Sequence, residues 1–193
     1  MLNFDNFEIK ANGEISKIFL QNGITKFSNA ADFIKNLPYG RNTDENNLKT
    51  VFNDNCGTCS TKHALLKVLA EENNENNLKL KLGIFKMNAQ NTPKIRQTLE
   101  QNHLKYIPEA HNYLKINDKI LDCTNTNSSE NDFIDDLLIE IDIKPTQITD
   151  FKVLYHTNYL KEWLKKQSNI LLNLEQIWQI REQCIKDLSQ NNA

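Results

Sequence analysis

The chain has 193 residues, of which 39% are hydrophobic and 25% charged, and its formal net charge is -2. A chain of this length and composition can bury an ordinary core without disulfides, which excludes a protein that is disordered throughout. The balanced charge, with only three arginines, argues against a general nucleic-acid binder and against phosphate clamping by arginine.

The sequence contains no signal for a membrane. No apolar run approaches the roughly 20 residues that a transmembrane helix needs. The first ten residues, MLNFDNFEIK, lack the basic and apolar segments of a signal peptide. We therefore expect a cytoplasmic protein without a membrane partner, whose cysteines are thiols: Cys56, Cys59, Cys123 and Cys184.

The first part of the chain predicts helices after a weakly patterned start. Residues 1–27 favour short strands or turns. Ser28 is expected to cap a short helix that Pro38 ends, and another short helix follows through Phe52. Residues 59–72 predict the strongest helix, because they carry a broad apolar face and contain neither Pro nor Gly.

The middle of the chain predicts the strands. Residues 78–87 begin with alternating apolar and polar side chains, which indicates a half-buried strand. A Thr-Pro pair opens a predicted helix over 92–102. Two short runs, 110–116 and 119–124, flank Asn117-Asp118 and predict a β-hairpin.

The last third predicts helices. They are expected over 133–139 and 155–166, and a final helix reaches about Leu188. Asn173 with Gln176 three residues later forms a possible capping box at the start of that final helix.

This order of elements predicts an α+β fold with a central antiparallel sheet, on which the helix over 59–72 packs. We expect one domain over 1–193. It comprises a helical or irregular part over 1–50, a core over 52–124 and a helical part over 131–190.

Cys59 is expected to begin the strongest helix. The unpaired N–H groups and the positive dipole end of a helix both favour a thiolate there. The pKa of a cysteine in that position can lie well below its free value of about 8.5. Gly57 would let the backbone turn sharply into the helix. The alternative is that Cys59 is a small buried side chain at a helix start.

His111 and Asp122 share one face of the predicted hairpin. With Asn117-Asp118 as a two-residue turn, Leu114 pairs with Leu121. His111 then lies diagonally across from Asp122, within side-chain reach. The alternative is an ordinary surface His and Asp on an exposed sheet face.

Together these residues predict a catalytic triad. A nucleophilic thiol needs a base, and the imidazole of His111 suits this role because its pKa is near neutrality. Asp122 would fix the tautomer of His111. Asn53, six residues before Cys59, is a candidate oxyanion-hole donor beside the backbone N–H of Cys59.

These motifs resemble the transglutaminase-like cysteine enzymes, which use a papain-like Cys-His-Asp triad. The resemblance rests on Gly57-Thr58-Cys59 with Ala64-Leu65-Leu66, on His111 about fifty residues later, and on Leu121-Asp122-Cys123-Thr124. It covers about residues 52–124. Many members carry a Trp after the His and before the Leu-Asp, where this chain has Asn112-Tyr113 and Lys119-Ile120.

The resemblance implies thiol-dependent acyl chemistry on an amide or related carbonyl, most simply hydrolysis by a cysteine peptidase or amidase. The expected substrate is a peptide, a protein or a small amide. Neither cofactor nor metal is implied, and neither nucleic acid nor a membrane is expected as a partner. The resemblance leaves open whether water or an amine completes the reaction.

Several alternatives compete with this interpretation. Cys56 and Cys59 could form the redox pair of a thioredoxin-like protein. Cys56, Cys59 and His63 could bind zinc together with Cys123 or His111. A protein with the same fold could also bind partners without catalysis. His63, one helical turn after Cys59, is expected to pack in the core or face solvent rather than act as the base.

Overall fold

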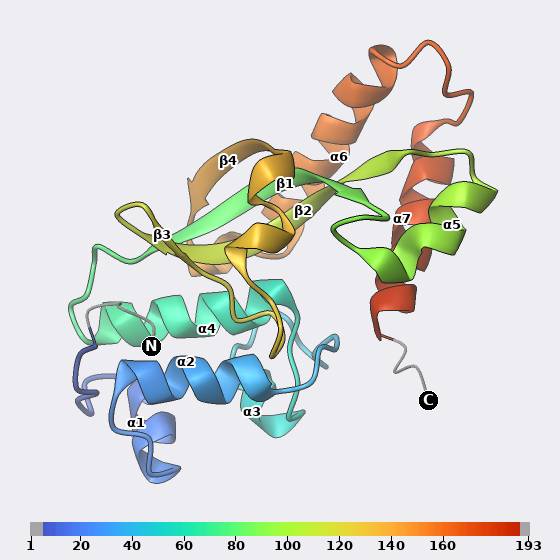
Figure 1. Cartoon of the computed structure of the whole chain (residues 1–193). Coiled ribbons are helices and arrows are strands. Elements are labelled where there is room, and N and C mark those ends of the chain that lie inside the picture. Colours follow the sequence, from blue (N-terminus) through green and yellow to red (C-terminus); the bar gives the residue numbers. More distant parts are fainter. Residues whose placement is uncertain (1–5, 190–193) are drawn as a thin grey trace. The chain divides into compact units, whose positions relative to one another are not determined.

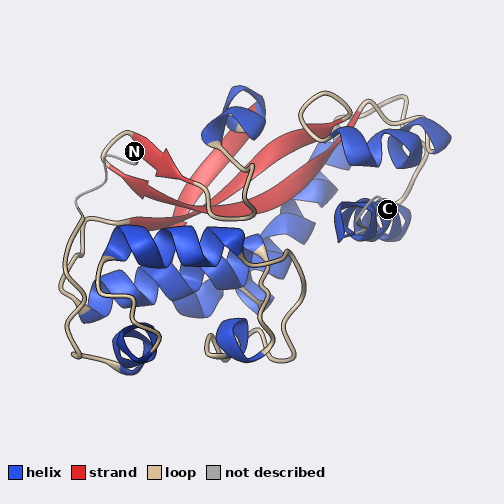
Figure 2. Cartoon of the chain, turned by 60° about the horizontal axis from the view of Figure 1, so that its bottom comes forward, coloured by secondary structure: helices blue, strands red, loops and turns tan. Residues whose placement is uncertain are grey.

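The protein has an α+β fold with a four-stranded antiparallel sheet, as the sequence predicts. The computed structural model describes residues 6–189 (Figure 1). The strands are β1 (Lys79–Asn88), β2 (Tyr106–Ile116), β3 (Lys119–Leu121) and β4 (Leu137–Ile143), in the order β3-β2-β1-β4. The helices are α1 (Glu14–Gln21), α2 (Phe27–Asn36), α3 (Thr50–Asn53), α4 (Cys59–Glu72), α5 (Arg96–Gln101), α6 (Asp150–Lys165) and α7 (Leu174–Ser189) (Figure 2).

The described residues cluster into two compact units. Unit 1 contains 6–82, 112–130 and 141–149, and unit 2 contains 83–111, 131–140 and 150–189. The single domain over 1–193, with parts 1–50, 52–124 and 131–190, stays a prediction. No helix within 6–189 is long and apolar enough to cross a membrane.

In unit 1 the helices α1, α2 and α3 all contact α4. Phe19 of α1 packs edge-on against Phe33 of α2 and Phe52 of α3, with ring centroids 6.4 and 5.0 Å apart. Almost every side chain of α4 is buried, including those of polar residues in its first two turns. A helix buried on all sides is a central core element, and this burial brings polar side chains of α4 into the interior.

The predicted β-hairpin is confirmed in its register. Leu114 pairs with Leu121, and Ile116 pairs with Lys119. The two residues between these strands form the turn, in which Asn117 adopts a left-handed φ of 52°. Asn tolerates this conformation better than most residues. The sequence Asn117-Asp118 therefore fixes which residues of β2 and β3 face each other.

Three predictions for individual elements are wrong. Residues 14–21 form α1 rather than strands or turns. Ser28 makes no cap, because α2 begins at Phe27 and Lys26 is its N-cap. Residues 137–143 form β4 instead of the helix predicted over 133–139. In β4 three isoleucines alternate with Glu140 and Asp142, a period that suits a strand.

The final helix begins as predicted. The backbone N–H of Gln176 donates to Asn173 Oδ1 at 3.0 Å, and the N–H of Asn173 donates to Gln176 Oε1 at 2.9 Å. This reciprocal pair is a capping box. It places the first turn of α7 at Leu174.

A buried ion pair stabilises unit 2. Arg181 of α7 donates from Nε and an Nη atom to the carboxylate oxygens of Glu109 at 2.8 and 2.6 Å. Burial alone would raise the pKa of Glu109, but the Arg181 charge and its hydrogen bonds hold that pKa below its usual value. His156 lies close by and donates from Nε2 to the Pro108 carbonyl at 2.8 Å.

Replacement of Arg181 by Met is therefore expected to destabilise the protein by about 3–5 kcal/mol, because the Glu109 carboxylate loses its buried partner. Urea denaturation at pH 7 measures this difference. Because the folded-state pKa of Glu109 is lowered, its contribution is present above about pH 4 and is lost as the pH falls further. Lys165→Met, which removes an exposed ion pair with Glu162, is the control and should change stability little. An equal effect of both variants would contradict the prediction.

Candidate functional site

Helix α4 begins at Cys59 because its N-terminus is capped by Thr58. The Thr58 hydroxyl accepts from the Thr61 N–H at 3.3 Å, and the Thr61 hydroxyl accepts from the Thr58 N–H at 3.0 Å. Two donors at the helix start are thereby satisfied reciprocally. Cys59 is the first helical residue, as predicted, and is 7% exposed.

Gly57 lies at the crowded entrance to α4. A Cβ atom at this position would lie 2.9 Å from Lys62 Cγ and 3.0 Å from Thr61 Oγ1. The Gly57 backbone also exchanges hydrogen bonds with the segment around Tyr39, in a short parallel bridge. Close approach of side chains, in addition to the expected sharp turn, therefore explains the glycine.

Asn42 fixes the loop that leads to Cys59. Its Nδ2 donates to the Cys56 carbonyl at 3.0 Å, and its Oδ1 accepts from the Thr61 hydroxyl at 2.7 Å. The sequence places Asn42 in a polar stretch before the third helix and provides no local signal for this role. Asn42 thus links the residues on both sides of Gly57.

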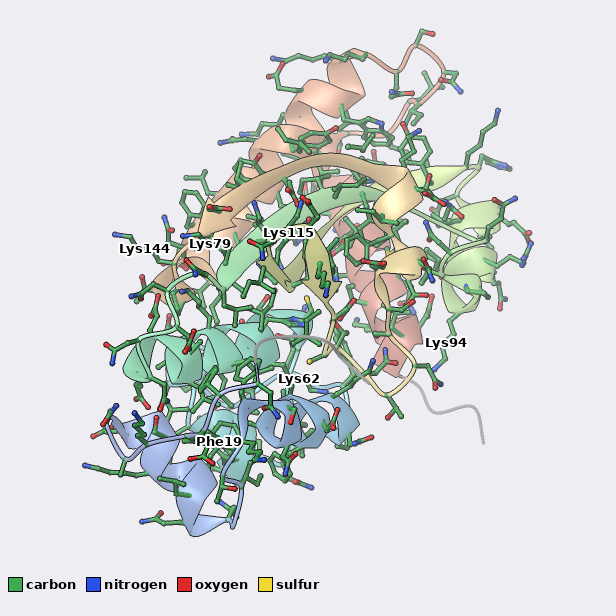
Figure 3. All side chains as sticks on the ribbon, turned by 60° about the vertical axis from the view of Figure 1, so that its left-hand side comes forward. Phe19, Lys62, Lys79, Lys94, Lys115 and Lys144 are labelled. Atoms are coloured by element: carbon green, nitrogen blue, oxygen red, sulfur yellow. The ribbon has the colours of Figure 1, made fainter. Side chains whose placement is uncertain are left out.

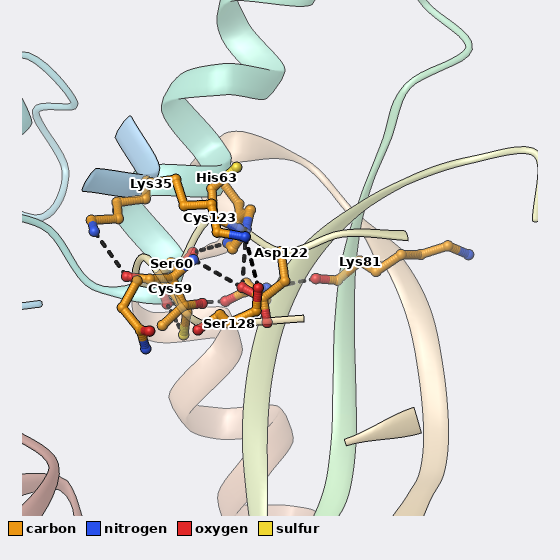
Figure 4. A network of polar contacts seen from close by, with 12 residues as sticks. Lys35, Cys59, Ser60, His63, Lys81, Asp122, Cys123 and Ser128 are labelled. Atoms are coloured by element: carbon orange, nitrogen blue, oxygen red, sulfur yellow. Dashed lines mark hydrogen bonds and ion pairs between the residues drawn. The ribbon is translucent and has the colours of Figure 1, made fainter. Parts of the chain in front are cut away.

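Asp122 lies immediately after β3 and is buried. Its Oδ1 accepts from the Thr124 N–H at 2.9 Å and lies 3.6 Å from His63 Nε2 (Figure 4). The hydrogen bond from the Thr124 N–H therefore orients the Asp122 carboxylate. Cys59 and Asp122, far apart in the sequence, belong to the same compact unit.

His63 is fully buried between the start of α4 and the segment that follows β3. Its Nδ1 lies 2.6 Å from the Cys59 carbonyl oxygen, and its Nε2 accepts from the Cys123 N–H at 2.6 Å. The ring must then be neutral and carry its proton on Nδ1. His63 is therefore buried rather than facing solvent. That it is not the base stays a prediction.

Lys62 is a buried lysine that the sequence did not single out. Its Nζ donates to the Leu37 carbonyl at 2.6 Å and to the Thr124 carbonyl at 2.8 Å. Lys62 is fully buried, whereas Lys79 and Lys144 are exposed (Figure 3). Burial lowers the pKa of Lys62 to about 8, so the ammonium is still mostly charged at pH 7.

Burial raises the pKa of each of the other three thiols. It raises the pKa of Cys123 to about 12, with Asp122 adding to the effect, and raises that of Cys184 to about 12, with Asp187 adding to it. Burial and the charge of Asp54 also raise the pKa of Cys56. All four cysteines are free thiols in the structure.

His111 is half-buried in β2, within unit 2. Its ring lies edge-on to Phe133 and Phe85, with ring centroids 4.9 and 6.1 Å apart. These contacts limit the orientations that the imidazole can adopt. The triad of Cys59, His111 and Asp122 draws on both units and remains a prediction.

Asn53, the candidate oxyanion-hole donor, is the last residue of α3 and is exposed. Its role also remains a prediction. No protein-family model matches the chain, and no curated protein or solved structure matches it either.

Two of the alternative interpretations lose support. A thioredoxin-like motif needs a buried strand directly before Cys56, but α3 and a turn stand there. The proposed zinc ligands include His63, both of whose ring nitrogens are engaged in hydrogen bonds. Within residues 6–189 no group of three or more His, Cys, Asp or Glu side chains could hold a metal ion.

Proposed function

We propose that the protein is a cysteine hydrolase or acyltransferase of the transglutaminase-like type. Cys59 is the nucleophile, His111 the base and Asp122 the residue that orients the base. The observation that carries the proposal is the linkage of Cys59 to Asp122. His63 bonds to the Cys59 carbonyl and lies 3.6 Å from the Asp122 carboxylate.

The position of Cys59 supports its role as the nucleophile. It is the first residue of a 14-residue helix, where the N–H groups and the helix dipole favour negative charge. Burial raises the pKa values of Cys123 and Cys184, which makes those thiols poor nucleophiles at neutral pH.

In the proposed reaction the Cys59 sulfur attacks the carbonyl carbon of an amide, and the thiol proton passes to His111. When the tetrahedral intermediate collapses, the C–N bond breaks and His111 returns the proton to the leaving amine. Water or a second amine then attacks the thioester and regenerates the thiol. The backbone N–H of Cys59 and the side chain of Asn53 are the proposed donors to the oxyanion.

Cys59 is expected to be alkylated first among the four cysteines during brief treatment with iodoacetamide at pH 7. Thiols with a pKa near 12 hold more than a thousandfold less thiolate than a free cysteine, so Cys123 and Cys184 should stay unlabelled. Peptide mass spectrometry locates the label.

The variant Cys56→Ser is the control for the redox alternative. The proposal expects Cys59 to keep its reactivity in this variant, because only a redox pair needs both sulfurs. First labelling at Cys123 or Cys184 would overturn the nucleophile assignment. Loss of Cys59 reactivity in Cys56→Ser would favour the thioredoxin-like alternative instead.

A further inference from the structure

Two consecutive side chains of α4 hold the short segment that contains Asp122. His63 accepts from the Cys123 N–H (Figure 4), and Lys62 donates to the Thr124 carbonyl. The Thr124 N–H donates a hydrogen bond to the Asp122 carboxylate. Three backbone polar groups of residues 122–124 are therefore satisfied by side chains, two of them from the helix that begins with Cys59.

Apolar contacts with one turn of α4 would be enough to pack residues 122–124 against the helix. Burying polar side chains is unfavourable unless each is hydrogen-bonded, and here each of them has specific partners. Lys62 has a second partner in the Leu37 carbonyl at the end of α2, and His63 has a second partner in the Cys59 carbonyl. Hydrogen bonds constrain the direction of a contact as well as its distance, whereas apolar contacts do not constrain direction.

The protonation state of His63 bears directly on Asp122. A backbone N–H at 2.6 Å requires a lone pair on Nε2, so the ring holds its proton on Nδ1. A charged His63 would lose the Cys123 bond and could bind Asp122, whose Oδ1 is only 3.6 Å away. The neutral ring keeps the Cys123 bond, which a charged ring would lose.

We propose that Lys62 and His63 are positioning residues that clamp residues 122–124 onto α4 and hold the Asp122 carboxylate in place for catalysis. The catalytic part of this inference rests on the proposed function above. The clamp itself is a property of unit 1 and is testable without any substrate.

The first test uses the wild-type protein labelled with ¹⁵N at histidine. NMR should show His63 as a neutral ring protonated on Nδ1 between pH 6 and 8, with a slowly exchanging ring proton. The exposed His103 serves as the internal comparison. A proton on Nε2 of His63, or a charged His63 ring within this pH range, would overturn the proposal.

The second test compares Lys62→Met with Lys67→Met. Lys67 is also buried on α4, but its partner is Glu71 of the same helix, at 3.2 Å. Lys62→Met should accelerate hydrogen exchange at the amides of Cys123 and Thr124. It should also slow acylation of Cys59 by an activated aryl ester about 10- to 100-fold, the effect expected of a small misplacement. Lys67→Met should do neither.

The outcomes separate the two proposals. Equal effects of both lysine variants, or no change at either amide in Lys62→Met, would overturn the clamp. If the wild-type protein is not acylated at Cys59, the proposed function fails, whereas the ring tautomer and the amide exchange still decide the clamp. The measurements on wild-type His63 remain decisive even if Lys62→Met does not fold.

Discussion

Replacement of Asp122 by Asn is expected to lower the rate of acylation at Cys59 by about 10³–10⁴-fold, the effect of the corresponding change in serine-protease triads. Asn keeps the shape of the side chain, but its amide favours the wrong tautomer of His111 and does not stabilise the charged ring. The measurement is the release of phenolate from an activated aryl ester at pH 7.

Asp118→Asn is the matched control for this experiment. Asp118 lies in the turn of the same hairpin and is exposed, so the same isosteric change there should leave the rate unaltered. A rate for Asp122→Asn within tenfold of the wild type would remove Asp122 from the proposed triad.

Replacement of His111 by Ala is expected to slow alkylation of Cys59 at pH 7 by about 10- to 30-fold. An unassisted cysteine with a pKa of about 8.5 is only about 3% thiolate at this pH, so loss of an imidazole partner removes most of the nucleophile. The rate should recover as the pH is raised toward 9, because the thiol then ionises without help.

The histidine controls distinguish the base from its neighbours. His103→Asn should leave the rate unchanged, because His103 is exposed and Asn tolerates its left-handed φ of 54°. His63→Ala should have a smaller effect than His111→Ala, because His63 acts through the position of Asp122. A larger effect of His63→Ala would mean that the base is wrongly assigned.

The elements that local patterns specify could be predicted from the sequence. Helix α4 has a continuous apolar face and a threonine cap, and the turn residues Asn117-Asp118 determine the register of the hairpin. The position of Cys59 at a helix start follows from the first of these elements. Asp122 comes directly after β3, which ends at Leu121 rather than at residue 124 as predicted. Both signals are contained within a dozen or so consecutive residues.

Helix α1 could not be predicted because its cap comes from a distant residue. The carboxylate of Glu72, in the last turn of α4, accepts from the N–H groups of Ile15 and Ser16 at 3.0 and 2.6 Å. A Cβ at Gly13 would displace the Glu72 side chain from this position. Gly13 stands at the N-cap, so no nearby side chain caps this helix start.

The hydrogen bonds of Lys62 and His63 to residues 122–124 could not be predicted for a similar reason. A Lys-His pair inside an apolar helix resembles two solvent-facing residues until the tertiary partners are known. The Leu37, Cys123 and Thr124 backbone groups that satisfy Lys62 and His63 come from segments far along the chain. Sequence patterns indicate which residues are polar, but the fold determines which polar groups are buried together.

The measurement that tests the central claim most directly is the mass of the peptide containing Cys59 after reaction with an activated aryl ester and rapid acid quenching. We expect one acyl group on Cys59 in the wild type, much slower formation of this adduct in Asp122→Asn, and none at this position in Cys59→Ala. An acyl group on Cys56 in the wild type, or no covalent adduct while phenolate is released, would contradict it.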